Sequence, residues 1–204
     1  METIYYIIIT AGAVVVFFVF VLLFRRMLLS RTDELGKRKV NGILKRFGVF
    51  RGYKLIKDIE LPVGNDYTCC DSILVGYFGI ILIKTCGVKG EYYGAGYDKS
   101  WIFTKKSNGN SPKKYIPNPN KVLDQNINAI RDILKKEEIY KVSIDAVLVT
   151  TIEKNRFFVT KLDYPLMTEK ELKKLLSKSK YESDSGIDIE KIVSALDKYA
   201  KKQK

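Results

Sequence analysis

The first hydrophobic feature of the chain is an uncharged apolar run over Ile4–Phe24. At ~1.5 Å per residue, a helix of this length spans the roughly 30 Å hydrocarbon core of a bilayer. A cleaved signal peptide fits less well, because only Glu2 is charged before the run and large residues continue up to Phe24. The pattern therefore predicts one uncleaved transmembrane helix, which with its basic flank occupies residues 1–30.

Beyond this run, the spacing of apolar residues predicts a folded domain that contains both helices and strands. Thr32, Asp33 and Glu34 are typical of a helix start, and apolar positions follow at helical spacing up to Gly48. Later helices are predicted over Asn120–Lys136, Thr168–Lys178 and Ile187–Lys202. Strands are predicted over Tyr53–Leu61, Thr68–Val75, Gly79–Thr85, Glu91–Tyr93, Trp101–Thr104, Val142–Thr151 and Arg156–Thr160, with a loop over Ser107–Asn120.

The two most hydrophobic strands are predicted to form a hairpin. If Tyr77 and Phe78 make the turn, Asp71 lies opposite Lys84, and Cys69 lies opposite Cys86 by the same register. The order of the elements predicts an α/β fold built on a mixed central sheet flanked by helices. We expect this domain over residues 31–160 and a helical C-terminal extension over residues 161–204.

Composition narrows the chemistry that the domain can perform. The 204 residues include no histidine, which excludes Ser-His-Asp and Cys-His catalysis and histidine-based metal sites. The 36 Lys and Arg residues exceed the 23 Asp and Glu residues, which gives a net charge of +13. Such an excess predicts an anionic partner, either nucleic acid or acidic lipid.

Part of this charge lies beside the predicted membrane segment. Between Arg25 and Arg46 there are eight Lys or Arg residues against Asp33 and Glu34, a local net charge of +6. The positive-inside rule then predicts an outside N-terminus and a cytoplasmic domain. Contact with anionic lipid headgroups accounts for much of this local charge, so the membrane itself is a predicted partner.

The three cysteines indicate neither a disulfide framework nor a standard zinc site. Cys69, Cys70 and Cys86 are odd in number, contain no Cys-x-x-Cys pair, and lie in a predicted cytoplasmic domain. We expect them to be small buried hydrophobic side chains.

With the strands placed, the residues resemble the NERD family, the nuclease-related domain of the PD-(D/E)xK nuclease superfamily. The resemblance runs from about Gly36 to Thr151, and an ordered set of short motifs carries it. These motifs are Gly36-Lys37, Asp58–Pro62, Asp71, Gly79–Cys86, Gly90 with Tyr92, Gly94 and Trp101, Asn118-Pro119, and Gln125-Asn126.

The resemblance implies a restriction-endonuclease-like fold and a candidate catalytic site. In the family, two carboxylates on adjacent strands hold Mg²⁺, and a nearby lysine assists electrostatically. The matching positions here are Asp71 for the first carboxylate, Lys84 for the second, and Cys86 for the lysine. Lys37 occupies the position of the acidic residue in the family's first helix.

Only Asp71 keeps the residue type that metal binding requires. A lysine ammonium opposite Asp71 would occupy the place of the metal and repel a cation. Our hypothesis is that Asp71 and Lys84 form an internal ion pair and that the domain is a non-catalytic, cofactor-free relative of the nucleases.

Two alternatives use the same region. A displaced carboxylate, Glu91, could rebuild an active site with Lys84 or Lys89, in which case Mg²⁺ is the expected cofactor. Cys69, Cys86 and Asp71 could instead hold zinc, although a set without histidine or Cys-x-x-Cys is a weak zinc signal.

A second group of residues suggests nucleic-acid binding. Aromatic and basic side chains together hold single strands, although such aromatics are also common in cores. The candidates are Trp101, Lys105, Lys106, Lys113, Lys114 and Gln125. The resulting prediction is a membrane-anchored domain that binds nucleic acid or a protein partner; the alternatives are a metal-dependent nuclease with displaced residues and a membrane scaffold.

Overall fold

The computed structural model describes residues 14, 16–17, 20, 33–105 and 112–202. The predicted membrane helix therefore falls almost entirely outside the described residues. Across the described part of the chain, no helix is both long and apolar enough to cross a membrane.

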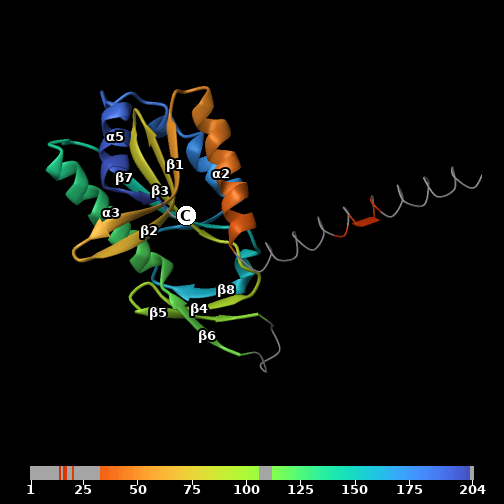
Figure 1. Ribbon diagram of the computed structural model, residues 1–204. Coiled ribbons are helices and arrows are strands. Elements are labelled where there is room, and N and C mark those ends of the chain that lie inside the picture. The colour runs from red at the N-terminus through yellow and green to blue at the C-terminus, as the bar shows by residue number, and fades with distance from the viewer. Residues whose placement is uncertain (1–13, 15, 18–19, 21–32, 106–111, 203–204) are drawn as a thin grey trace, which may run out of the picture.

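The described residues after 32 form two sheets (Figure 1). The main sheet has six described strands in the order β10-β1-β2-β3-β7-β9, and the small sheet has four in the order β6-β5-β4-β8. The main-sheet strands are β1 (Lys54–Val63), β2 (Asp66–Gly76), β3 (Gly79–Cys86), β7 (Ile144–Thr150), β9 (Leu166–Thr168) and β10 (Lys201–Lys202). The small-sheet strands are β4 (Glu91–Ala95), β5 (Ser100–Thr104), β6 (Lys114–Pro117) and β8 (Phe157–Thr160).

The main sheet is mixed, as the sequence predicts. Its first half is antiparallel through β3, and β7 and β9 then continue in parallel. The centre is apolar, because Ile80–Ile83 are almost completely buried. Parallel strands need crossover connections, and the helix between β6 and β7 lies within one such connection.

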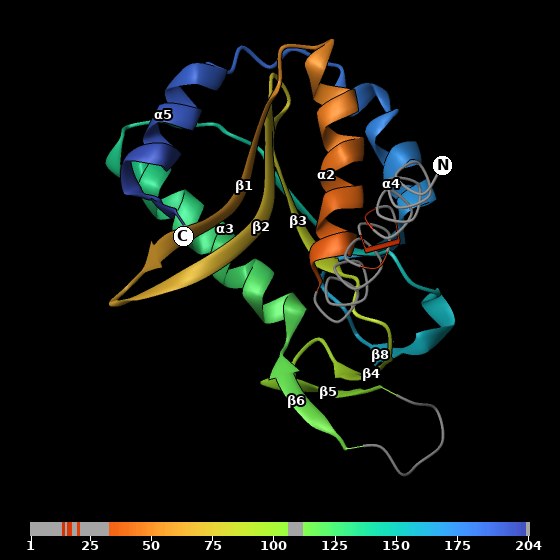
Figure 2. The same ribbon diagram turned by 45° about the vertical axis from the view of Figure 1, so that its right-hand side comes forward.

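Four described helices cover the two faces of the main sheet (Figure 2). On one face lie α2 (Glu34–Val49) and α4 (Glu169–Leu176), and on the other lie α3 (Pro119–Lys136) and α5 (Ile189–Tyr199). Leu44 of α2 and Ile130 of α3 are both fully buried. These layers confirm the predicted α/β class, with helices flanking a mixed sheet.

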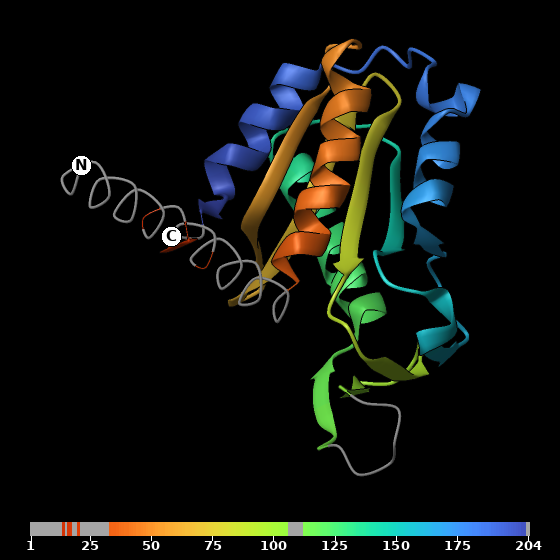
Figure 3. The same cartoon turned by 90° about the vertical axis from the view of Figure 1, so that its right-hand side faces the viewer.

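The chain after residue 160 completes the main sheet. β9 pairs with β7 at one edge, and β10 pairs with β1 at the other. Figure 3 shows α4 and α5 on either side of this sheet. The two predicted C-terminal helices are therefore present, and short strands beside them, which the sequence pattern did not predict, join the sheet.

The small sheet packs beside one end of the main sheet and differs from expectation in one strand. The sequence predicts a loop over Ser107–Asn120, yet β6 lies within it and pairs with β5. Lys114–Pro117 is short and half polar, so its pairing depends on the neighbouring strand more than on its own pattern.

Candidate functional site

The candidate site lies where β2 and β3 separate. Their register follows the predicted pairing and ends with Ser72 opposite Ile83. Beyond this pair, the Thr85 backbone N–H donates to the Asp71 carboxylate Oδ2 at 3.0 Å. The Asp71 side chain is fully buried, so its carboxylate accepts this backbone hydrogen bond in the interior of the protein.

The predicted contact between Asp71 and Lys84 is confirmed. The Lys84 Nζ lies 2.9 Å from Asp71 Oδ1 and donates a hydrogen bond to it. Burial lowers the pKa of Lys84, but attraction to Asp71 outweighs burial, and the net pKa lies above its usual value. The Asp71 carboxylate therefore favours the charged ammonium form of Lys84.

A second lysine contacts the same oxygen, which the sequence did not predict. The Lys37 Nζ on α2 lies 3.0 Å from Asp71 Oδ1 and 3.1 Å from Asp58 Oδ1. Burial lowers the pKa of Lys37, whereas Asp71 and Asp58 raise it, and the net pKa is above the ordinary value. The charged form of both lysines is thus favoured beside one buried carboxylate.

The Asp33 carboxylate belongs to the same cluster. It accepts a hydrogen bond from the Gly87 backbone N–H, just after β3. Burial raises the pKa of Asp33 to about 6, and the negative charge of Asp71 adds to the increase. The sequence identified Asp33 only as a helix start; its nearness to Asp71 depends on how α2 docks, which no local pattern records.

We call these five side chains the charge cluster: Asp33, Lys37, Asp58, Asp71 and Lys84. Asp71 Oδ1 contacts two ammonium groups and Oδ2 contacts a backbone N–H, so both oxygens already have donors. A divalent cation needs carboxylate oxygens with no cation beside them. The residues present therefore do not fit the Mg²⁺ site of the related nucleases.

The other candidate catalytic residues, Cys86 and Glu91, make none of these contacts with Asp71. Cys86 is almost completely buried, and burial raises the pKa of its thiol well above the usual value. Glu91 lies on β4 of the small sheet and accepts a hydrogen bond from the Tyr93 hydroxyl at 2.6 Å. Among the described residues, no three Cys, Asp or Glu side chains group as metal ligands, so Glu91 completes no such set with Asp71, nor do Cys69 and Cys86.

Close packing explains one glycine at the site. A Cβ on Gly36 would lie 2.9 Å from Thr151 Oγ1, 3.0 Å from the Gly87 Cα and 3.2 Å from Thr85 Cγ2. Glycine here lets the start of α2 approach the ends of β3 and β7. This approach brings Lys37 and Asp33 to Asp71.

The sequence model of one protein family, the nuclease-related domain (NERD), matches residues 32–151. The chain belongs to the NERD family. No curated protein and no solved structure is detectably similar to it.

Several NERD motif positions have structural roles. Trp101 is fully buried and donates from Nε1 to the Ala95 carbonyl at 3.0 Å. Gly94 lies against this ring, since an added Cβ would be 2.4 Å from Trp101 Cδ1. Asn118 begins α3 and donates from Nδ2 to the carbonyls of Ala95, Gly96 and Asp98.

The burial of Trp101 corrects its proposed place among the nucleic-acid-binding residues. A base cannot stack on a ring with no exposed surface, so Trp101 is a core residue. Lys113 and Lys114 are exposed near β6, Gln125 is exposed on α3, and Lys106 lies outside the described residues.

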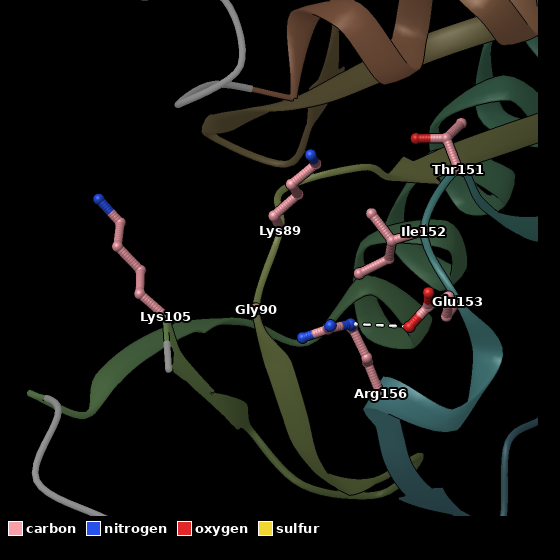
Figure 4. Close-up of a pocket in the computed structure, with 7 residues that line it drawn as sticks. All are labelled: Lys89, Gly90, Lys105, Thr151, Ile152, Glu153 and Arg156. Atoms are coloured by element: carbon pink, nitrogen blue, oxygen red, sulfur yellow. Dashed lines mark hydrogen bonds and ion pairs between the residues drawn. The ribbon is translucent and has the colours of Figure 1, made fainter. Parts of the chain in front are cut away.

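Lys105 lies in a cleft where the two sheets meet (Figure 4). The cleft has a volume of about 670 Å³ and is lined by Lys89, Gly90, Lys105, Thr151, Ile152, Glu153 and Arg156. Its single described carboxylate, Glu153, accepts a hydrogen bond from Arg156 Nε at 3.2 Å. Three basic side chains against one acid give the cleft a net positive charge.

Proposed function

We propose that this NERD protein is a non-catalytic, membrane-anchored protein whose cytoplasmic domain binds nucleic acid near the inner membrane surface. The observation that carries the non-catalytic part is the double contact of Lys37 and Lys84 with Asp71 Oδ1. At ~4 Å and an effective dielectric constant near 20, each ammonium opposes a cation by about 4 kcal/mol per unit charge.

Charge supports the binding part of the proposal. The chain carries a net charge of +13, and the cleft beside the small sheet has three basic residues. Polyanions gain affinity from such surfaces by releasing counterions, so binding must weaken steeply with salt. A protein partner with an acidic surface is the competing occupant.

Three measurements test the proposal. Calorimetry of the purified chain with Mn²⁺ should give no binding heat, and incubation of DNA or RNA with Mg²⁺ or Mn²⁺ should leave the strands intact. Fluorescence anisotropy should show nucleic-acid binding that weakens between 50 and 200 mM salt. Cleavage that disappears in an Asp71→Ala variant would overturn the non-catalytic assignment.

A metal-dependent nuclease is the second candidate, and one observation favours it. The negative charge of Asp71 contributes to the raised pKa of Asp33, so these two carboxylates lie close enough to interact. Mn²⁺ binding that is lost in both Asp33→Asn and Asp71→Asn variants would support this candidate over ours.

Membrane anchoring rests on the uncharged Ile4–Phe24 run and its basic flank. A membrane scaffold whose charge serves lipid contact alone would bind anionic vesicles and show no salt-dependent affinity for nucleic acid. Cell fractionation tests anchoring directly, because an anchored chain stays in the membrane pellet after a high-salt or carbonate wash.

A further inference from the structure

The small sheet has one core face and one open face. Tyr92 and Trp101 belong to the same buried cluster as the residues of the main sheet, so the core face turns toward the main sheet. The open face carries four side chains that strand register joins across the sheet, in the order Phe158 of β8, Tyr93 of β4, Ile102 of β5 and Tyr115 of β6. We call these four residues the aromatic row.

The aromatic row is exposed and almost free of charge. Tyr93 is 37% exposed, Phe158 is 53% exposed and Tyr115 is 72% exposed. The four strands of the sheet contain one acidic residue, Glu91, and one basic residue, Lys114, and each stands at the first position of its strand. Glu91 accepts a hydrogen bond from the Tyr93 hydroxyl at 2.6 Å. The open face is therefore an uncharged aromatic surface with one carboxylate at its edge.

Such a surface has the chemistry of a side chain layer at a bilayer interface. Tyrosine has an apolar ring and a polar hydroxyl, and it is enriched where one end of the side chain is apolar and the other is wet. Tyr93 and Phe158 stack with ring centroids 4.9 Å apart, so their rings form one continuous apolar patch. Lipid headgroups and the adjoining acyl chains can contact this patch while the tyrosine hydroxyls stay hydrated.

The chain enters the domain beside the small sheet. The Asp33 carboxylate accepts a hydrogen bond from the backbone N–H of Gly87, which lies in the connection from β3 to β4. Figure 2 shows that α2 begins at the end of the main sheet where the small sheet lies. A segment that precedes Asp33 therefore joins the domain next to the small sheet.

The length of that segment limits how far the domain can lie from a membrane. Phe24 ends the uncharged run, and Asp33 follows nine residues later. In any conformation, nine residues reach at most ~30 Å. A compact domain of the length of residues 33–202 has a diameter of ~40 Å. The tether to the proposed anchor is thus shorter than the domain is wide, and the end with Asp33 and the small sheet is the end nearest to the bilayer.

We propose that the aromatic row is the surface through which the domain contacts the bilayer, with its rings at the level of the lipid headgroups. This inference rests on the membrane-anchoring part of the proposed function and specifies which face of the domain lies on the membrane. None of the four residues lines the basic cleft, so lipid and nucleic acid use different surfaces.

The experiment measures the depth of two labelled positions in vesicles that contain the full chain. Tyr115→Cys and Phe50→Cys each carry a nitrobenzoxadiazole fluorophore, and half of the samples contain lipids with a nitroxide quencher on the headgroup. Phe50 is the matched control, because it is 90% exposed and follows the far end of α2, ~24 Å from Asp33 along the helix axis. We expect the nitroxide lipids to remove most of the fluorescence at position 115 and little at position 50.

The aromatic residues are tested in the same labelled chain. Tyr93→Gln with Phe158→Gln, added to Tyr115→Cys, should restore most of the fluorescence, because the face loses its apolar contact with the bilayer. Tyr140→Gln should leave the quenching unchanged, since Tyr140 is 68% exposed and lies in the connection between α3 and β7. The native chain, labelled in the same way, gives the background from its own cysteines, and circular dichroism establishes that each variant is folded.

The remaining outcomes separate this inference from the proposed function. If a carbonate wash removes the native chain from the vesicles, the proposed anchoring and the inference are both wrong. If the chain stays in the vesicles and positions 115 and 50 are quenched equally, the inference alone is overturned. Quenching that Tyr93→Gln and Phe158→Gln leave unchanged overturns it as well. A shifted emission at position 115 without lipid quenching assigns the aromatic row to a contact with another protein chain, and the inference is again wrong.

Discussion

The Nζ atoms of Lys37 and Lys84 lie 3.0 and 2.9 Å from the same oxygen, Asp71 Oδ1. One lysine comes from the first described long helix and the other from the central strand β3, so the contact joins two layers of the fold. Each ammonium is mostly buried, with 17% and 20% of its side chain exposed. The consequences for stability differ between the shared acceptor and its two donors.

Removal of the shared acceptor should cost more than removal of either donor. Asp71→Asn leaves Lys84 without an anion and Lys37 with Asp58 alone, and we expect a loss of about 3–5 kcal/mol in the free energy of unfolding. Lys84→Met leaves Asp71 with Lys37 and the Thr85 N–H, so we expect a loss of about 1 kcal/mol. Urea unfolding followed by the fluorescence of the single tryptophan, Trp101, measures both. Equal losses would contradict the shared role of Asp71.

The pH dependence of stability should contain a contribution from Asp33. Its pKa in the folded protein is raised to about 6 from 3.8, so the folded state holds a proton that the unfolded state has released between these values. Stability from this group is therefore present below pH 4 and is lost as pH rises through 6. Asp33→Asn keeps an acceptor for the Gly87 N–H and removes the ionisation.

Relative to the native chain, Asp33→Asn should gain about 2 kcal/mol of stability as pH rises from 4 to 6. Urea unfolding at half-unit pH intervals measures this difference. The charged neighbours of Asp33, namely Asp71, Lys37 and Lys84, are unchanged in the variant. Asp132→Asn, which alters an exposed carboxylate on α3, is the control. If the difference in the free energy of unfolding between Asp33→Asn and the native chain stays constant from pH 4 to 6, the pKa of Asp33 is not raised and the prediction is wrong.

Two glycines of α2 should respond to alanine in opposite directions. An added Cβ at Gly36 meets Thr151, Gly87 and Thr85 at 2.9–3.2 Å, so Gly36→Ala should destabilise the protein by about 1–3 kcal/mol. Gly42→Ala adds a methyl group with nothing within 4 Å and should stabilise the helix by about 0.5–1 kcal/mol. Thermal unfolding of the two variants side by side tests the close approach of α2 to the sheet.

Restoring the residue types of the nuclease motif should restore metal binding. The triple change Lys37→Glu, Lys84→Glu and Cys86→Lys removes both ammonium groups from Asp71 and returns the carboxylates that hold Mg²⁺ in the superfamily. We expect Mn²⁺ binding heat in this variant and none in the native chain. The same triple variant with Asp71→Asn is the control and should bind no Mn²⁺.

The sequence predicted the contact between Asp71 and Lys84, because a hairpin with a two-residue turn has a fixed register. Lys37 and Asp33 were not placed beside Asp71, since their positions depend on the docking of a helix onto the sheet. The prediction for Trp101 was wrong for a related reason. Aromatic and basic residues close in sequence suggested a binding surface, but the Trp101 side chain lies on the core face of its strand. Tyr93, Phe158 and Tyr115 are exposed on one face of the small sheet but come from distant segments, so only the strand register brings them together.

The charge cluster has a consequence for electroneutrality. Its three carboxylates and two ammonium groups sum to one negative charge when all are ionised, and a proton on Asp33 makes the sum zero. Both cations that contact Asp71 are thus side chains of the protein itself, whereas the related nucleases bind a metal ion from solution at this place. The native fold of this domain should accordingly be indifferent to chelators and to the supply of divalent metal.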